Sequence, residues 1–169
     1  MQDEKLTAAH VKELYEKHGA ALAAYACCCG LDFAAAEDAV QQIFLRLLRG
    51  DTSTPQVPAA YLYRAVRNAS LNLRRDRSRE TAPVEEETWF VRERGAPEEV
   101  LALQAALSEL PEEQREVVFL RMWSGLTLKE IADATKMPIN TTASRYRYAL
   151  EKLRERLKPR VAKEPYVES

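Results

Sequence analysis

Apolar residues recur at helical spacing along almost the whole chain. One run occupies positions i, i+3, i+4, i+7 and i+8 with Val40, Ile43, Phe44, Leu47 and Leu48. This spacing predicts the buried stripe of a helix, which Gly50 and the following "DTSTPQVP" end. No alternating pattern of useful length is visible, so the sequence predicts an all-α fold.

A second apolar stripe predicts a helix whose other faces are basic. The stripe consists of Leu62, Ala65, Val66, Ala69 and Leu73. The other faces carry Arg64, Arg67, Asn68, Leu71, Arg74 and Arg75. An earlier helix is indicated by Leu14, Ala21, Leu22 and Tyr25.

The second half of the chain carries clear helix signals. One helix is expected from Val100 to Leu110, and Pro111 begins another that runs to about Trp123. The acids of its first turn, Glu112 and Glu113, suit the helix dipole.

The next helix start is marked by a capping box. Thr127 can cap the helix, Glu130 completes the box, and Leu126 can pack on Ile131 as a hydrophobic staple.

Two consecutive helices predict a helix-turn-helix. The first runs from Thr127 to about Thr135, the turn covers Lys136 to Asn140, and the second helix runs from Thr141 to about Leu157. In this motif the N-terminal residues of the second helix enter the major groove. We expect an inward face of Thr142, Tyr146, Ala149, Leu150 and Leu153. We expect an outward face of Thr141, Ser144, Arg145 and Tyr148, which can reach bases or phosphates.

The net charge of -1 hides a strong segregation of charge. Residues 64–79 are basic, residues 80–99 are rich in Glu, and residues 145–160 are basic again. The acidic stretch contains Pro83, Gly95 and Pro97 and has no sustained period, so it predicts a linker. We therefore expect two small helical domains, 1–79 and 99–160, joined by the linker 80–98 and followed by a tail, 161–169.

Three consecutive hydrophobic residues interrupt the acidic linker. Trp89, Phe90 and Val91 either pin it to one domain or dock on a partner.

Composition and spacing exclude several classes of function. No apolar run approaches the ~18 residues of a membrane span, and the N-terminus has no signal-peptide pattern, so we expect a cytoplasmic protein. The three consecutive cysteines of "CCC", Cys27 to Cys29, point in three directions on a helix, and no metal-binding spacing accompanies them. We therefore interpret them as small residues that pack in the protein. No catalytic constellation is visible, so neither enzyme activity nor any cofactor or metal is expected.

Three motifs in order resemble the extracytoplasmic function (ECF) sigma factors of the sigma-70 family. "EDAVQQIFLRLL" resembles the helix that binds the clamp of the polymerase largest subunit, and "YLYRAVRNASLNLRRDRSR" resembles the helix that melts and reads the −10 promoter element. The segment from "LSELPEEQ" to "EKLRERL" resembles the domain that reads the −35 element.

The resemblance implies a set of site residues and partners. Contacts to the polymerase core are expected at Asp38, Gln41, Gln42 and Phe44. Contacts to the −10 element are expected at Arg64, Arg67, Asn68, Asn72, Arg74 and Arg75. Contacts to the −35 element are expected at Asn140, Thr141, Ser144, Arg145, Arg147 and Tyr148. The implied partners are the polymerase clamp and flap, promoter DNA and an anti-sigma factor.

Further implications concern the connecting segments. In the family the loop at "DTSTPQVP" captures a flipped base, and the linker passes near the polymerase active site; a merely solubilising linker is the alternative. Lys136 stands where Gly is common, and Thr142 and Tyr146 stand where aliphatic residues are common. Two alternatives to a sigma factor remain: a DNA-binding regulator with an N-terminal sensing or dimerisation domain, and a sigma-like protein that does not open DNA.

Overall fold

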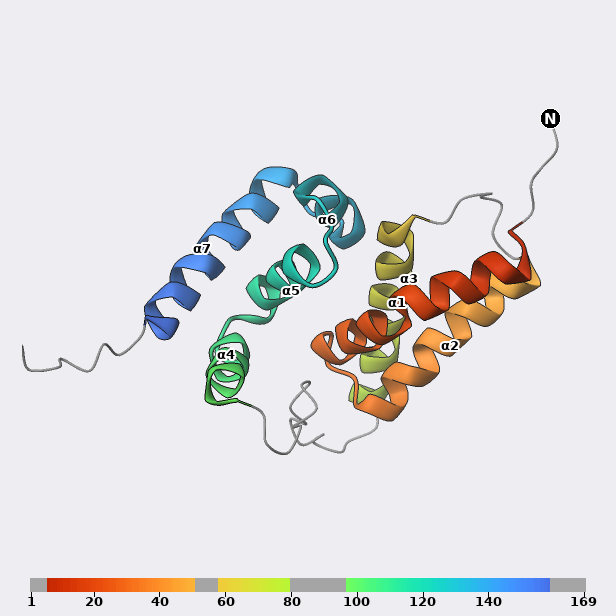
Figure 1. Ribbon diagram of the computed structural model, residues 1–169, viewed down its shortest axis with the longest axis horizontal. Coiled ribbons are helices and arrows are strands. Elements are labelled where there is room, and N and C mark those ends of the chain that lie inside the picture. Colours follow the sequence, from red (N-terminus) through yellow and green to blue (C-terminus); the bar gives the residue numbers. More distant parts are fainter. Residues whose placement is uncertain (1–5, 51–57, 80–96, 159–169) are drawn as a thin grey trace, which may run out of the picture.

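The computed structural model describes residues 6–50, 58–79 and 97–158, and these ranges contain helices and no strand. The helices are α1 (Ala8–Cys28), α2 (Phe33–Arg49), α3 (Ala59–Arg79), α4 (Glu98–Ser108), α5 (Glu112–Met122), α6 (Leu128–Thr135) and α7 (Ile139–Leu157). The expected all-α fold is confirmed. Helices α1 to α3 form one group and α4 to α7 the other, and α6 lies between α7 and α3 (Figure 1). The stretch "DTSTPQV", the Trp89–Val91 cluster and the tail lie outside the described residues.

The N-terminal group is a three-helix unit with capped ends. Thr7 caps α1 by accepting from the backbone N–H of His10, and Asp32 caps α2 by accepting from Ala35 at 2.8 Å. Gly50 ends α2 in the left-handed conformation, at φ 74°, which costs a glycine little. These caps define the start of α1 and both ends of α2.

The predicted stripe of α2 is buried except at its last position. Leu47 is buried, whereas Leu48 is 52% exposed, contrary to the expectation. Each residue turns a helix by about 100°, and the buried Ala39 extends the stripe on the side away from Leu48. Leu48 therefore falls beyond the edge of the stripe.

The stripe of α3 also ends early. Leu73 is exposed because the buried part of this helix stops at Ser70.

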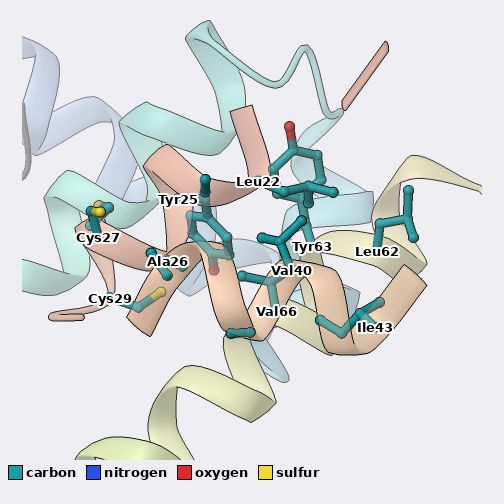
Figure 2. Packing of buried hydrophobic residues seen from close by; sticks show 14 of the residues in the cluster. Leu22, Tyr25, Ala26, Cys27, Cys29, Val40, Ile43, Leu62, Tyr63 and Val66 are labelled. Carbon is teal, nitrogen blue, oxygen red and sulfur yellow. The ribbon is translucent and has the colours of Figure 1, made fainter. Parts of the chain in front are cut away.

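One apolar cluster joins the two domains. It combines most of the buried residues of α1 to α3 with Val117, Phe119, Leu120, Leu126 and Ile131 of the second domain. Figure 2 shows Leu22 and Tyr25 of α1 beside Tyr63 and Val66 of α3 within it. The domains therefore share a core in addition to a smaller cluster of the second domain, which consists of Ala106, Leu107, Leu110, Val118, Ala149 and Leu153.

The corner between α4 and α5 is closed by one side chain. The guanidinium of Arg115 donates to the carbonyl oxygens of Leu107, Ser108 and Leu110 at 3.1, 2.9 and 3.0 Å. These acceptors include carbonyls at the end of α4 that have no partner within their own helix. Pro111 then precedes α5, as the sequence predicts.

Candidate DNA and polymerase interfaces

The helix-turn-helix is built from local signals. The Thr127 hydroxyl accepts from the backbone of Glu130 at 3.1 Å, and the Glu130 carboxylate accepts from the backbone of Thr127 at 2.7 Å, so the capping box is confirmed. Lys136 ends α6 at φ 56°, the left-handed conformation that favours glycine. Lys136 therefore takes a backbone conformation that glycine adopts readily, at a cost in backbone strain.

The second helix begins two residues earlier than predicted. Pro138 precedes α7, and its carbonyl accepts the backbone N–H of Thr142 at 3.0 Å, so Asn140 lies in the first turn rather than before it. The buried Thr142 hydroxyl also donates to the Pro138 carbonyl, at 3.2 Å. This bond explains how a polar residue occupies a position where aliphatic residues are common.

The six predicted −35 contacts differ in how exposed they are. Asn140, Arg147 and Tyr148 are exposed, and the Arg147 guanidinium lies 5.2 Å from the Tyr148 ring centroid. Thr141, Ser144 and Arg145 are half-buried. On the inward face Thr142, Ala149 and Leu153 are buried, while Tyr146 and Leu150 are half-buried. The structure thus brings the six predicted contacts together on the N-terminal half of α7.

The predicted −10 contacts lie on α3, and two of them are engaged by the other domain. Arg64, Asn68, Asn72 and Arg75 have exposed side chains. Arg67 donates to Glu116 at 2.6 Å, and Arg74 donates to Glu112 at 2.5 Å. Both acceptors belong to α5, so the basic face of α3 is partly covered.

Glu116 is the centre of this contact and was not predicted from the sequence. Its carboxylate accepts from Arg67 and from the Tyr25 hydroxyl at 2.5 Å, and its side chain is 13% exposed. Burial raises the pKa of Tyr25 well above its ordinary value, and the charges of Cys29 and Glu116 raise it further. Burial lowers the pKa of Arg67, but the charge and hydrogen bond of Glu116 outweigh this effect and raise it. Tyr25 therefore stays a donor and Arg67 stays charged.

The predicted polymerase-binding residues also differ in exposure. Asp38, Gln41 and Gln42 are exposed on α2. Phe44 is 5% exposed and meets Tyr15 edge-on at 5.1 Å between ring centroids, since it belongs to the buried stripe. Its ring supports the helix and does not reach the surface.

The three cysteines pack in the core. All are buried free thiols, and burial is the main cause that raises the pKa of Cys28 and of Cys29. Across the described ranges no group of three His, Cys, Asp or Glu side chains is placed to hold a metal ion. The packing role expected for "CCC" agrees with this burial.

An apolar groove in the second domain was also missed. It has a volume of about 730 Å³ and is lined mainly by Leu103, Leu107, Val118, Trp123, Leu153 and Leu157. Met122, at its edge, is 59% exposed. The adjacent Met122 and Trp123 at the end of α5 are a sequence signal that could have indicated it.

Together these features define a two-domain helical DNA-binding protein. One domain holds a helix-turn-helix whose second helix exposes Asn140, Arg147 and Tyr148, and the other holds a basic helix. None of the described helices is both long and apolar enough to cross a membrane.

Comparison with known proteins gives the family. Residues 14–80 match the model of Sigma-70 region 2, and residues 101–153 match that of Sigma-70, region 4. The ECF RNA polymerase sigma factor SigL of Mycobacterium tuberculosis is 31% identical over 158 residues, covering 87% of this chain and 88% of that protein. The chain belongs to the ECF RNA polymerase sigma factors, as its motifs indicated.

Solved structures share the fold. The sigma factor RpoE of Bartonella quintana, in complex with the anti-sigma factor NepR, is 24% identical with a TM-score of 0.69, covering 88% of this chain and 99% of that one. CnrH in complex with the cytosolic domain of CnrY is also 24% identical, with a TM-score of 0.63 and coverage of 90% of each chain.

Proposed function

We propose that this chain binds core RNA polymerase, recognises a two-part promoter, helps to melt it and leaves after initiation. The observation that carries the proposal is the match to both sigma-70 regions, in order, on one chain. It acts by binding and not by catalysis, and it acts in the cytoplasm, where transcription takes place.

The −35 element is assigned to the N-terminal half of α7. Asn140, Arg147 and Tyr148 are exposed there and offer an amide, a guanidinium and a phenol to bases and phosphates. Thr141, Ser144 and Arg145 lie among them. Their proximity on the second helix of a helix-turn-helix supports this assignment.

The −10 element is assigned to α3. Holding unpaired bases out of the stack costs a few kcal/mol per base, which contacts to bases and phosphates must offset. Asn68 and Asn72 are exposed and can hydrogen-bond to bases, and the arginines of α3 can neutralise phosphates. We place this helix in a domain of residues 1–79, the linker at 80–98 and the −35 domain at 99–160.

Polymerase contacts are assigned to two surfaces. The exposed Asp38, Gln41 and Gln42 of α2 form a polar face for the clamp. The apolar groove beside Trp123 is our candidate surface for the flap. An anti-sigma factor is a further proposed partner. The support is that RpoE was solved in complex with the anti-sigma factor NepR, and CnrH in complex with the cytosolic domain of CnrY.

Run-off transcription tests the proposal. Purified chain and bacterial core polymerase are combined with DNA from upstream of the protein's own gene and its neighbours. A defined transcript that depends on the chain is expected. If the chain binds this DNA but yields no transcript and does not co-elute with core polymerase, the alternative of a DNA-binding regulator is correct instead.

A further inference from the structure

The last turns of α3 extend beyond the core of the first domain. The buried part of the helix stops at Ser70, and the side chains of residues 71–77 are exposed or half-buried. Arg74 and Arg77 stand three positions apart, where like charges destabilise a helix. A helix end without buried contacts frays readily. The segment that carries Arg74 and Arg75, two of the predicted −10 contacts, therefore needs an anchor.

An acid in the turn between α1 and α2 contacts this segment. Oδ2 of Asp32 accepts from Nη1 of Arg77 at 3.0 Å. Oδ1 of the same carboxylate caps α2 by accepting from the backbone N–H of Ala35 at 2.8 Å. The cap holds the carboxylate in place, so the ion pair ties the end of α3 to the start of α2.

The charge of Asp32 is secure at neutral pH. The backbone hydrogen bond from Ala35 is the main cause that lowers the pKa of Asp32. Burial acts in the opposite direction, and the hydrogen bond and charge of Arg77 lower the pKa further. The pair between Asp32 and Arg77 is therefore a pair of full charges.

A glycine in the same turn lets the basic helix approach. Gly30 has φ 100°, a conformation that favours glycine. A Cβ at this position would lie 2.9 Å from Nε and 3.1 Å from Cδ of Arg74, so the Arg74 side chain passes directly over the bare backbone. The turn thus receives two arginines of α3, one on Gly30 and one on Asp32.

We propose that Asp32 is a positioning residue for the −10 element: by holding Arg77 it keeps the last turns of α3 helical and so aligns Arg74 and Arg75 with the DNA backbone. The inference rests on the proposed function, which assigns those two arginines to DNA. Its consequence separates Asp32 from other acids near the DNA. Asp32 repels phosphate, yet its presence strengthens binding, because arginines that are already aligned lose less freedom when they bind.

The test replaces Asp32 with Asn in the full chain. Asparagine caps a helix about as well as aspartate does, so α2 keeps its start while the charge that faces Arg77 is lost. The matched control is Asp76→Asn, which removes the same charge from α3 itself. Asp76 is exposed and makes no ion pair with any residue that the structure describes. Arg77→Gln and the double variant Asp32→Asn, Arg77→Gln complete a cycle that isolates the coupling between the two side chains.

Two readouts are measured on each variant. Hydrogen–deuterium exchange across residues 71–77 reports how firmly the end of α3 is held in the absence of DNA. Fluorescence anisotropy at low salt gives the affinity for a short labelled single-stranded oligonucleotide of mixed sequence. We expect Asp32→Asn to exchange faster in this segment and to bind about threefold more weakly. We expect Asp76→Asn to bind up to about twofold more tightly, because an acid close to phosphate is removed. With Arg77→Gln already present, Asp32→Asn should no longer weaken binding.

Contrary outcomes are distinguishable. If Asp32→Asn binds as tightly as the unchanged chain or more tightly, the acid only repels DNA and the positioning role is wrong. Equal weakening by Asp32→Asn with and without Arg77 would indicate damage at the start of α2 and would also overturn the proposal. If Asp32→Asn does not fold, Arg77→Gln decides, since its side chain is 40% exposed: faster exchange across residues 71–77 supports the pair, and unchanged exchange refutes it.

The exchange experiment does not depend on the proposed function. If exchange across residues 71–77 is the same in Asp32→Asn, the ion pair does not hold the end of α3, whatever the chain does in transcription. If exchange and affinity change as expected but the unchanged chain directs no transcription with core polymerase, the positioning role stands and the proposed function fails.

Discussion

Replacing Tyr25 with Phe isolates one hydrogen bond of the domain interface. Tyr25 is fully buried, and its hydroxyl donates to the Glu116 carboxylate at 2.5 Å. Phe fills nearly the same space, so the change leaves no large cavity but removes one donor from a carboxylate that is 13% exposed. Arg67 remains as the other donor, which limits the loss.

The expected cost follows from the kind of bond. A hydrogen bond to a charged group contributes about 1.5–3 kcal/mol, and we expect Tyr25→Phe to lower the free energy of unfolding by about 2 kcal/mol. For a chain of this size, 1 kcal/mol shifts Tm by about 2–4 °C. Thermal and urea unfolding followed by circular dichroism measure both quantities.

The pH dependence of this loss has a defined sign. Burial is the main cause that raises the pKa of Tyr25 above its ordinary value of about 10. A raised pKa means that the contribution of the hydroxyl is complete below that ordinary value and is lost only as the pH rises through the folded-state pKa. The difference between variant and unchanged chain should therefore be constant from about pH 6 to pH 9.

The matched control is Tyr15→Phe on the same helix. Tyr15 is 45% exposed, and we expect its hydroxyl to contribute less than about 0.5 kcal/mol. Equal stabilities of Tyr25→Phe and Tyr15→Phe would refute the assigned bond between α1 and α5.

Three further predictions address the turn, the DNA contacts and the polymerase contacts. Lys136→Gly should raise the free energy of unfolding by about 0.5–1 kcal/mol, because glycine relieves the strain at φ 56° but adds freedom to the unfolded chain; an unchanged or lower Tm would contradict this. Arg145→Ala should weaken binding to the −35 element by about 1–3 kcal/mol, and a footprint with unchanged affinity and specificity would count against α7 as the reading helix. The double change Asp38→Ala, Gln41→Ala should reduce co-elution with core polymerase while Tm stays the same, since both side chains are exposed; normal co-elution would remove them from the contact.

The features that the sequence predicts well are those whose causes are local. The capping box at Thr127 and Glu130 joins residues three positions apart, and the stripe of α2 repeats every turn. Errors of one or two residues arose where periodicity alone sets a boundary. The start of α7 at Ile139 and the exposure of Leu48 are examples.

The features that were missed depend on contacts between distant residues. Arg67 and Glu116 are 49 positions apart, and Tyr25 and Glu116 are 91 apart. The sequence places Phe119 in the helix that begins at Pro111, but it does not show that Tyr25 stacks on its ring. The acids of α5 were explained by the helix dipole alone, so the arginines opposite them were predicted as available for DNA.

Arg115 has a consequence for how the second domain can move. By donating to the carbonyls of Leu107, Ser108 and Leu110, it braces the joint between α4 and α5 from within. The angle between the two helices should therefore resist change, so α4 and α5 should behave as one rigid unit.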